Sequence, residues 1–179
     1  MKKRNYLVVI ALLFITQFAD AQKLPELDAS PADIAYFRPD GNNAAPVIKV
    51  VYGRPLKKGR TMLGGIEPFG KVWRLGANES TEIKLFKDVK FGDKQLKAGT
   101  YALFAIPDAN EWTVIFNSEL DKWGAFSYKE ANDVARIKVP SGKTEAPVEA
   151  FAIGFEGKDG KGNMIFAWEG TLIKVPFTY

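Results

Sequence analysis

Two segments of the chain combine glycine, arginine and aromatic residues without the alternation of a strand, and they hold the residue types best suited to chemistry. The first reads YGRPLKKGR over residues 52–60, and the second reads WRLGANE over residues 73–79. In the second segment Glu79 directly follows an amide, Asn78, and comes shortly after Arg74. A carboxylate in these surroundings is suited to general acid/base work or to holding a sugar hydroxyl or an amine. If the chain is an enzyme, we expect Glu79 to be the acid/base and Arg74 or Asn78 to stabilise developing charge.

Glu79 also has a structural interpretation. Glycoside hydrolysis needs a second carboxylate ~5–9 Å from the first. The candidates, if the fold brings them close, are Glu67, Glu82 and Asp121. The alternative, which the sequence favours, is an ion pair that fixes the loop through two-point guanidinium bonds. Its candidate partners for Glu79 are Arg54, Arg60 and Arg74.

The basic and aromatic residues of the chain allow binding as well as structure. Arg54, Arg60 and Arg74, with Lys57 and Lys58, would suit an anion such as a carboxylate, a phosphate or a uronic acid, and a purely structural use of them stays equally open. Trp112 and Trp168 lie in apolar strand patterns, so we expect them in the core. Trp123 lies in a loop and is the better surface candidate for stacking against a sugar. The candidate ligand-binding residues are Arg54, Lys58, Arg60, Trp73, Arg74, Asn78, Glu79 and Trp123.

Composition excludes several classes of site. The 179 residues include no cysteine and no histidine, which removes disulfides, thiol nucleophiles, catalytic triads that need histidine, and zinc or haem sites that need imidazole. We therefore expect no metal and no cofactor. The densest basic patch, at residues 57–60, is too short to indicate nucleic-acid binding.

The first twenty-one residues have the pattern of a secretory signal peptide. Lys2, Lys3 and Arg4 precede an apolar run over 6–18, which is too short to span a bilayer, and a small-x-small site ends at Ala21. We expect an exported protein, periplasmic or extracellular, with no transmembrane segment after cleavage. No cysteine is present for lipid attachment, so a lipoprotein is not expected.

The elements that must position these residues are short strands. Residues 81–86 alternate, with Thr81, Ile83 and Leu85 on one face, and residues 100–106 are apolar on both faces, as in a central strand. The predicted strands cover 47–52, 81–86, 100–106, 112–116, 134–139, 148–155, 164–168 and 171–177. The pattern predicts a single all-β domain, an antiparallel β-sandwich or jelly roll, with a long ordered loop rich in glycine and arginine.

The remaining segments are turns and a lead-in. Residues 22–46, with four prolines, predict an extended lead-in to a domain at 47–179, with one short helical turn at 30–33. A second helical turn is expected at 128–133. Residues 157–163 are glycine-rich and predict a hairpin loop, and residues 100–106 and 112–116 should form a second hairpin.

The two loop strings belong to a longer pattern. YGRPLKKGR and WRLGANE, then AGTYAL at 98–103, Trp112 and Asn117, resemble the family of exported proteins called domain of unknown function 2911. The resemblance runs from about residue 30 to the C-terminus. It implies an exported protein, chiefly from Gram-negative bacteria of the Bacteroidetes group, and it implies no activity.

Three functions are compatible with these patterns. The one we favour is an exported, non-enzymatic binding or accessory domain of the cell envelope, whose partner is a glycan, an anionic cell-wall fragment or small molecule, or another envelope protein. The alternatives are a small hydrolase that uses Glu79, and a purely structural or assembly domain.

Overall fold

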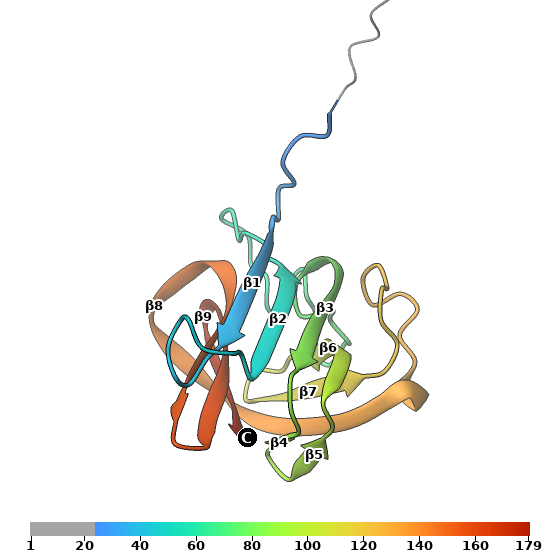
Figure 1. Cartoon of the computed structure of the whole chain (residues 1–179). Helices are drawn as coiled ribbons and strands as arrows, with labels where there is room; N and C mark the ends of the chain where they lie inside the picture. The colour runs from blue at the N-terminus through green and yellow to red at the C-terminus, as the bar shows by residue number, and fades with distance from the viewer. Residues whose placement is uncertain (1–23) are drawn as a thin grey trace, which may run out of the picture.

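The computed structural model describes residues 24–179, so the predicted signal peptide lies outside the described residues. The described chain is all-β, as predicted, and its nine strands form one antiparallel sheet that is not closed into a barrel (Figure 1). The strand order is β1-β2-β3-β6-β7-β8-β9-β4-β5. The bounds are β1 Ala32–Phe37, β2 Ile48–Gly53, β3 Ala77–Leu85, β4 Val89–Phe91, β5 Lys94–Leu96, β6 Gly99–Ile106, β7 Glu111–Asn117, β8 Asp133–Lys158 and β9 Lys161–Thr178.

The long strand β8 gives this sheet its sandwich-like form. Its first part pairs with β7 up to Pro140, and from Ser141 onward it pairs with β9. Figure 1 shows β8 sweeping across the base of the molecule and turning toward β9. One part of the sheet, made of β1, β2, β3, β6 and β7, therefore faces the other, made of β9, β4 and β5, across a shared core.

The core follows from the alternation of the strands. Ile83 and Leu85 of β3 are buried, whereas Lys84 and Phe86 are exposed, as the alternation over 81–86 predicts. The inward side chains of both parts form one apolar cluster, whose members include Val50, Ile83, Phe116, Phe151, Phe166 and Phe177. Trp112 and Trp168 belong to it too, which confirms their predicted place in the core.

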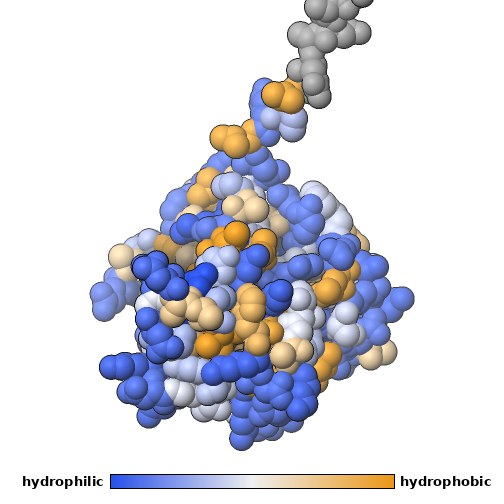
Figure 2. Space-filling view, viewed as in Figure 1, coloured by the Kyte–Doolittle hydropathy of each residue, from blue (hydrophilic) through white to orange (hydrophobic). Residues whose placement is uncertain are grey.

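A smaller cluster lies on the outer face of β6 and β7. Ala102, Phe104 and Ile115 are buried there beneath loop residues that include Leu120 and Tyr128. The strand predicted to be apolar on both faces, β6, therefore does pack on both. The outer face of β1 to β3 has no such cover from the part of the chain that the structure describes: Ile34 and Tyr36 are exposed, and Figure 2 shows apolar residues there scattered among polar ones.

The N-terminal part of the sheet differs from the sequence prediction. Strand β1 lies within the predicted lead-in, and the helical turn predicted at 30–33 is wrong, because Ala32 and Asp33 already pair with Gly53 and Tyr52 of β2. Cross-strand pairing therefore outweighs the helix-starting preference of Ser30 and Pro31.

The C-terminal strands are longer than the sequence predicts. Residues 134–139 and 148–155 belong to one strand, β8, and the last two predicted strands are both part of β9. The pairing of β8 with β9 is irregular on both sides of Val148, where its register shifts. The predicted hairpins are confirmed: β6 pairs with β7, and β8 turns into β9 at Asp159 and Gly160, whose positive φ values suit a two-residue hairpin turn. The second predicted helical turn is also present, as a 3-10 turn at Glu130–Asn132.

Candidate functional site

A groove of about 470 Å³ lies where the start of β3, the strand β2, the lead-in and the loop after β7 meet. Three of the residues predicted to bind a ligand line it: Asn78, Glu79 and Trp123. Glu82 and Asp121, two of the three acids proposed as partners of Glu79, line it as well. The other lining residues are Asp28, Ser30, Ala32, Val51, Tyr52, Gly53 and Ser80.

Backbone hydrogen bonds hold the two sides of the groove together. Strand β3 pairs with β6 from Thr81 onward, so its first residues are free to pair with the loop after β7. The Ser80 N–H donates to the Lys122 carbonyl at 2.8 Å, and the Gly124 N–H donates to the Asn78 carbonyl at 2.9 Å. Glu79 and Trp123 stand opposite each other in this short ladder. Their side chains therefore share one rim of the groove through main-chain pairing.

Two glycines of the motif strings allow the strands to approach at the groove. A Cβ atom at Gly53 would collide with the Ala77 carbonyl oxygen, and one at Gly76 would lie 2.9 Å from the Gly53 carbonyl oxygen. Asn78 itself has a positive φ of 64°, which turns the chain at the start of β3. The strings YGR and LGAN thus encode a close crossing of β2 and β3, and this crossing places Asn78 and Glu79 at the groove.

The groove is acidic. It is lined by four carboxylates, those of Asp28, Glu79, Glu82 and Asp121, and none of the described residues that line it is lysine or arginine. The Ser30 N–H donates to Asp28 at 2.6 Å, and this bond, with the Asn78 amide, holds the pKa of Asp28 below its ordinary value. Asp28 is therefore ionised at neutral pH.

Ser80 lies among these groups with an unused hydroxyl. Its residue is only 5% exposed, and its Oγ has no hydrogen-bond partner among the described residues. The neighbouring Thr81 hydroxyl, by contrast, donates to the Leu75 carbonyl at 2.7 Å. A buried hydroxyl without a partner is uncommon because it loses water without compensation.

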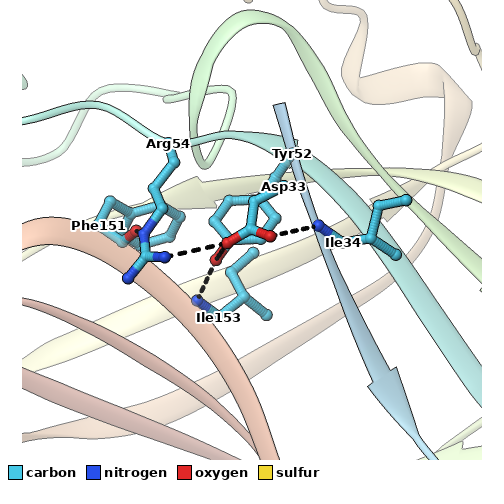
Figure 3. Close-up of polar contacts among 6 residues, drawn as sticks. All are labelled: Asp33, Ile34, Tyr52, Arg54, Phe151 and Ile153. Carbon is cyan, nitrogen blue, oxygen red and sulfur yellow. Dashed lines mark hydrogen bonds and ion pairs between the residues drawn. The ribbon is translucent and has the colours of Figure 1, made fainter. Parts of the chain in front are cut away.

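The predicted ion pair between Glu79 and an arginine is absent from the described residues, because each arginine is directed elsewhere. Glu79 is exposed and makes no ion pair there. Arg54 instead pairs with Asp33 at 3.1 Å and donates from Nε to the Phe151 carbonyl at 3.0 Å (Figure 3).

Arg54 belongs to a clamp between β2 and β8. Within it, Tyr52 accepts a hydrogen bond at its hydroxyl from the Ile153 N–H at 3.1 Å (Figure 3). Burial raises the pKa of Tyr52 above its ordinary value, so the hydroxyl stays protonated. The clamp joins the two parts of the sheet where β1 and β8 do not pair directly.

The other basic residues of the predicted cluster make hydrogen bonds that stabilise the loop at 54–76. Arg60 donates from Nε to the Lys57 carbonyl at 2.9 Å and from an η nitrogen to the Leu56 carbonyl at 2.8 Å. The Lys58 N–H donates to the Glu149 carboxylate at 2.6 Å, and its side chain is exposed. Neither Lys58 nor Arg60 lines the groove.

Trp73 and Arg74 also lie away from the groove. Trp73, predicted to contact a ligand, is 2% exposed, stacks on Trp168 with ring centroids 5.6 Å apart, and donates to the Gly76 carbonyl. Its ring is therefore part of the core and does not line the groove. Arg74 lies near Glu67, the third acid proposed as a partner of Glu79; burial raises the pKa of Glu67, and the Arg74 charge opposes that rise.

Sequence reasoning missed Asp28 and Ser80 as lining residues. Asp28 falls in the segment read as a lead-in, and only the fold brings that segment across β2. Ser80 sits between Asn78 and Glu82 in alternation with buried Thr81, so the two-residue period of β3 was the signal that would have found it.

Residues 24–179 contain neither an acidic metal-binding cluster nor a membrane-spanning helix. No group of acidic residues between 24 and 179 has the geometry to hold a metal ion. Over the same residues, no helix has the length and apolar character needed to cross a membrane.

Comparison with known proteins gives one match. A family described as "Protein of unknown function (DUF2911)" matches residues 34–177, which include both motif strings and most of the groove. No curated protein and no solved structure matches the chain significantly. The match covers more than half of the sequence, and the chain therefore belongs to the DUF2911 family.

Proposed function

We propose that this chain is an exported, non-enzymatic binding domain of the cell envelope and that its groove takes a saccharide. The observation that carries the proposal is Trp123, which is 62% exposed at the rim of a groove that also holds the Asn78 amide and four carboxylates. Export rests on the signal-peptide pattern of residues 1–21.

The groove combines the two kinds of contact that a sugar offers. The flat ring of Trp123 can cover the apolar C–H face of a pyranose, because aromatic side chains join a large apolar face to a polar edge. The Asn78 amide both donates and accepts hydrogen bonds, and the carboxylates accept them from hydroxyl groups. A volume of about 470 Å³ lies within the range of small-molecule pockets.

The acidic lining supports a saccharide over the anionic ligand that the arginines suggested. Arg54 and Arg60 already donate to carbonyl groups of the chain, and neither of them lines the groove. An anion in the groove would meet four carboxylates and no lining lysine or arginine. Like charges this close repel one another in poorly hydrated surroundings.

Binding is tested by titration calorimetry of the purified protein against a panel of neutral oligosaccharides. The panel contains oligomers of β-1,4-linked glucose, β-1,4-linked N-acetylglucosamine and α-1,4-linked glucose. We expect at least one to bind and the Trp123→Ala variant to weaken that binding at least about tenfold, the size of effect typical of a central aromatic contact.

Phe126→Ala is the matched control. Phe126 lies in the same loop and is 88% exposed, but it does not line the groove, so its removal should leave affinity unchanged. Equal losses in both variants, or no binding of any oligosaccharide in the panel, would refute the proposed saccharide function.

A hydrolase is the second candidate, supported by the fact that Glu79 shares the groove with Glu82 and Asp121. Paired carboxylates across a sugar are the machinery of glycosidases. We favour binding because the Glu79 carboxylate is exposed and makes no ion pair with a described residue that would orient it for proton transfer. Incubation of a bound oligosaccharide with the protein, followed by mass spectrometry, decides between the two: a shorter product that Glu79→Gln no longer forms would establish the hydrolase.

A further inference from the structure

The charge of the groove is uneven, because lysines lie near one of its four carboxylates. Glu82 also borders a small cavity lined by Lys49 and Lys84, which partly balance its charge. Asp28, Glu79 and Asp121 line only the groove itself. Lys122, the basic residue next to Trp123, pairs with Glu119 at 3.0 Å and so does not offset them.

Ser80 adds an independent reason to expect a donor in the ligand. Ser80 is one of the residues that line the groove, and its Oγ is buried without a partner among the described residues. A hydroxyl oxygen of this kind accepts a hydrogen bond from an N–H or O–H group. A ligand that supplies one would satisfy the hydroxyl and lower the cost of its burial.

Trp123 suits a positive charge as well as a sugar ring. A cation over the face of an indole is attracted by the negative charge of the ring face, and tryptophan is the best of the aromatic residues for this contact. The carboxylates of Glu79 and Asp121 line the same groove as this exposed ring.

We propose that the saccharide recognised by this groove carries a protonated amine, as in a glucosamine oligomer that lacks its acetyl groups. The proposal rests on the proposed saccharide function and names its ligand class. The ring of the sugar covers Trp123, the ammonium group lies among Asp28, Glu79 and Asp121, and a donor of the ligand reaches Ser80.

The experiment compares three probes by calorimetry of the purified protein: a glucosamine tetrasaccharide, an N-acetylglucosamine tetrasaccharide and spermidine. We expect the glucosamine oligomer to bind about tenfold more tightly than the acetylated one at an ionic strength of about 0.01 M. The difference should shrink at about 0.15 M, because the screening length falls from ~30 to ~8 Å.

Variants locate the source of the preference. Glu79→Gln and Asp121→Asn should each weaken binding of the glucosamine oligomer about two- to fivefold more than binding of the acetylated oligomer, the range for exposed charge pairs. Ser80→Ala should weaken the glucosamine oligomer too. Glu145→Gln is the control, because Glu145 is exposed on β8 and does not line the groove, and it should have no effect.

The outcomes separate this inference from the proposed function. Equal affinity for both oligomers, each lowered by Trp123→Ala, would overturn the amine preference and leave the saccharide function in place. Spermidine binding as tight as that of the glucosamine oligomer would overturn the saccharide function itself. An equal loss with Glu145→Gln would reduce the preference to a response to overall charge and overturn the inference.

Discussion

The loop at 54–76 and the groove beside β3 contain the same residue types, glycine, tryptophan and charged side chains, but they use them in opposite ways. At the loop, charged side chains bond to the backbone: Arg60 donates to two loop carbonyls, and the Glu169 carboxylate of β9 accepts from the Met62 and Leu63 N–H groups of the loop. At the groove, backbone hydrogen bonds position the side chains instead. The main-chain bonds of Asn78 and Ser80 to the loop after β7 hold Glu79 opposite Trp123.

The difference shows how to tell a structural motif from a binding motif in one chain. Polar groups that already have partners stabilise the fold and have little left to offer a ligand. Polar groups that are fixed in position but have no partner among residues 24–179, such as the Glu79 carboxylate and the Ser80 hydroxyl, are available to a ligand. Composition alone does not separate the two regions, because both are equally rich in the residues that bind ligands.

The sharpest test of this comparison uses Trp73 of the loop and Trp123 of the groove. Trp73→Ala should lower the free energy of unfolding by about 3–5 kcal/mol, because it empties a buried site and removes the bond to the Gly76 carbonyl. Trp123→Ala should change it by less than about 0.5 kcal/mol, as for other exposed sites. Urea titration measures both, and similar losses in the two variants would erase the distinction.

Substitutions of Glu169 and Glu79 should give the next largest difference in the free energy of unfolding. Glu169→Ala should cost about 2–4 kcal/mol, because it leaves the N–H groups of Met62 and Leu63, both buried, without acceptors. Glu79→Gln should stay within about 0.5 kcal/mol of the wild type. A loss of roughly 3 kcal/mol for Glu79→Gln would instead indicate a buried ion pair, contrary to the exposed position of Glu79.

A substitution at Arg54 measures how much the clamp between β2 and β8 contributes to stability. Arg54→Ala should cost about 1–2 kcal/mol, most of it from the bond to the Phe151 carbonyl. The ion pair with Asp33 adds little, because both side chains are about 40% exposed and water screens the pair. In a double-mutant cycle with Asp33→Asn, a coupling above about 1 kcal/mol would contradict this division.

Glu67 gives the smallest expected effect, and a pH dependence reveals it. Burial raises its pKa in the folded protein above the ordinary value of 4.5, so folding is favoured less once pH rises through that range and the carboxylate ionises. Glu67→Gln removes this loss. Its stability relative to the wild type should therefore increase between about pH 3 and pH 7. A relative decrease over the same range would mean that the Arg74 charge dominates the burial of Glu67.

The regular strands were predictable because the alternation of buried and exposed side chains depends on neighbouring residues in the sequence. The alternation at Thr81, Ile83 and Leu85, and the two apolar faces of β6, follow from which neighbours each residue has in a strand. The all-β class and both hairpins followed from these patterns. The family was predictable from the same motif strings that build the crossing of β2 and β3.

The partners of charged side chains were not predictable, because they lie far along the chain. Arg54 meets Phe151, and Asp28 reaches Asn78, only after the sheet has folded. Strand β1 was missed because Pro31 and Pro39 flank it, and β4 and β5 because three residues carry too little pattern. Of the site, the sequence therefore predicted the residues at the Trp123 rim but not the wall that faces them.

The position of β9 has a consequence for the order of events during synthesis. Its last residues pair with β4, and Phe177 packs against Phe37 and Phe91, so early and late parts of the chain meet in one core. A chain emerging from the ribosome N-terminus first cannot complete this core until β9 has been made. Until then the edges of β4 and β8 stay unpaired and apolar side chains stay exposed, which invites aggregation. We therefore expect the residues that precede β9 to remain unfolded and open to chaperones until β9 has been synthesised.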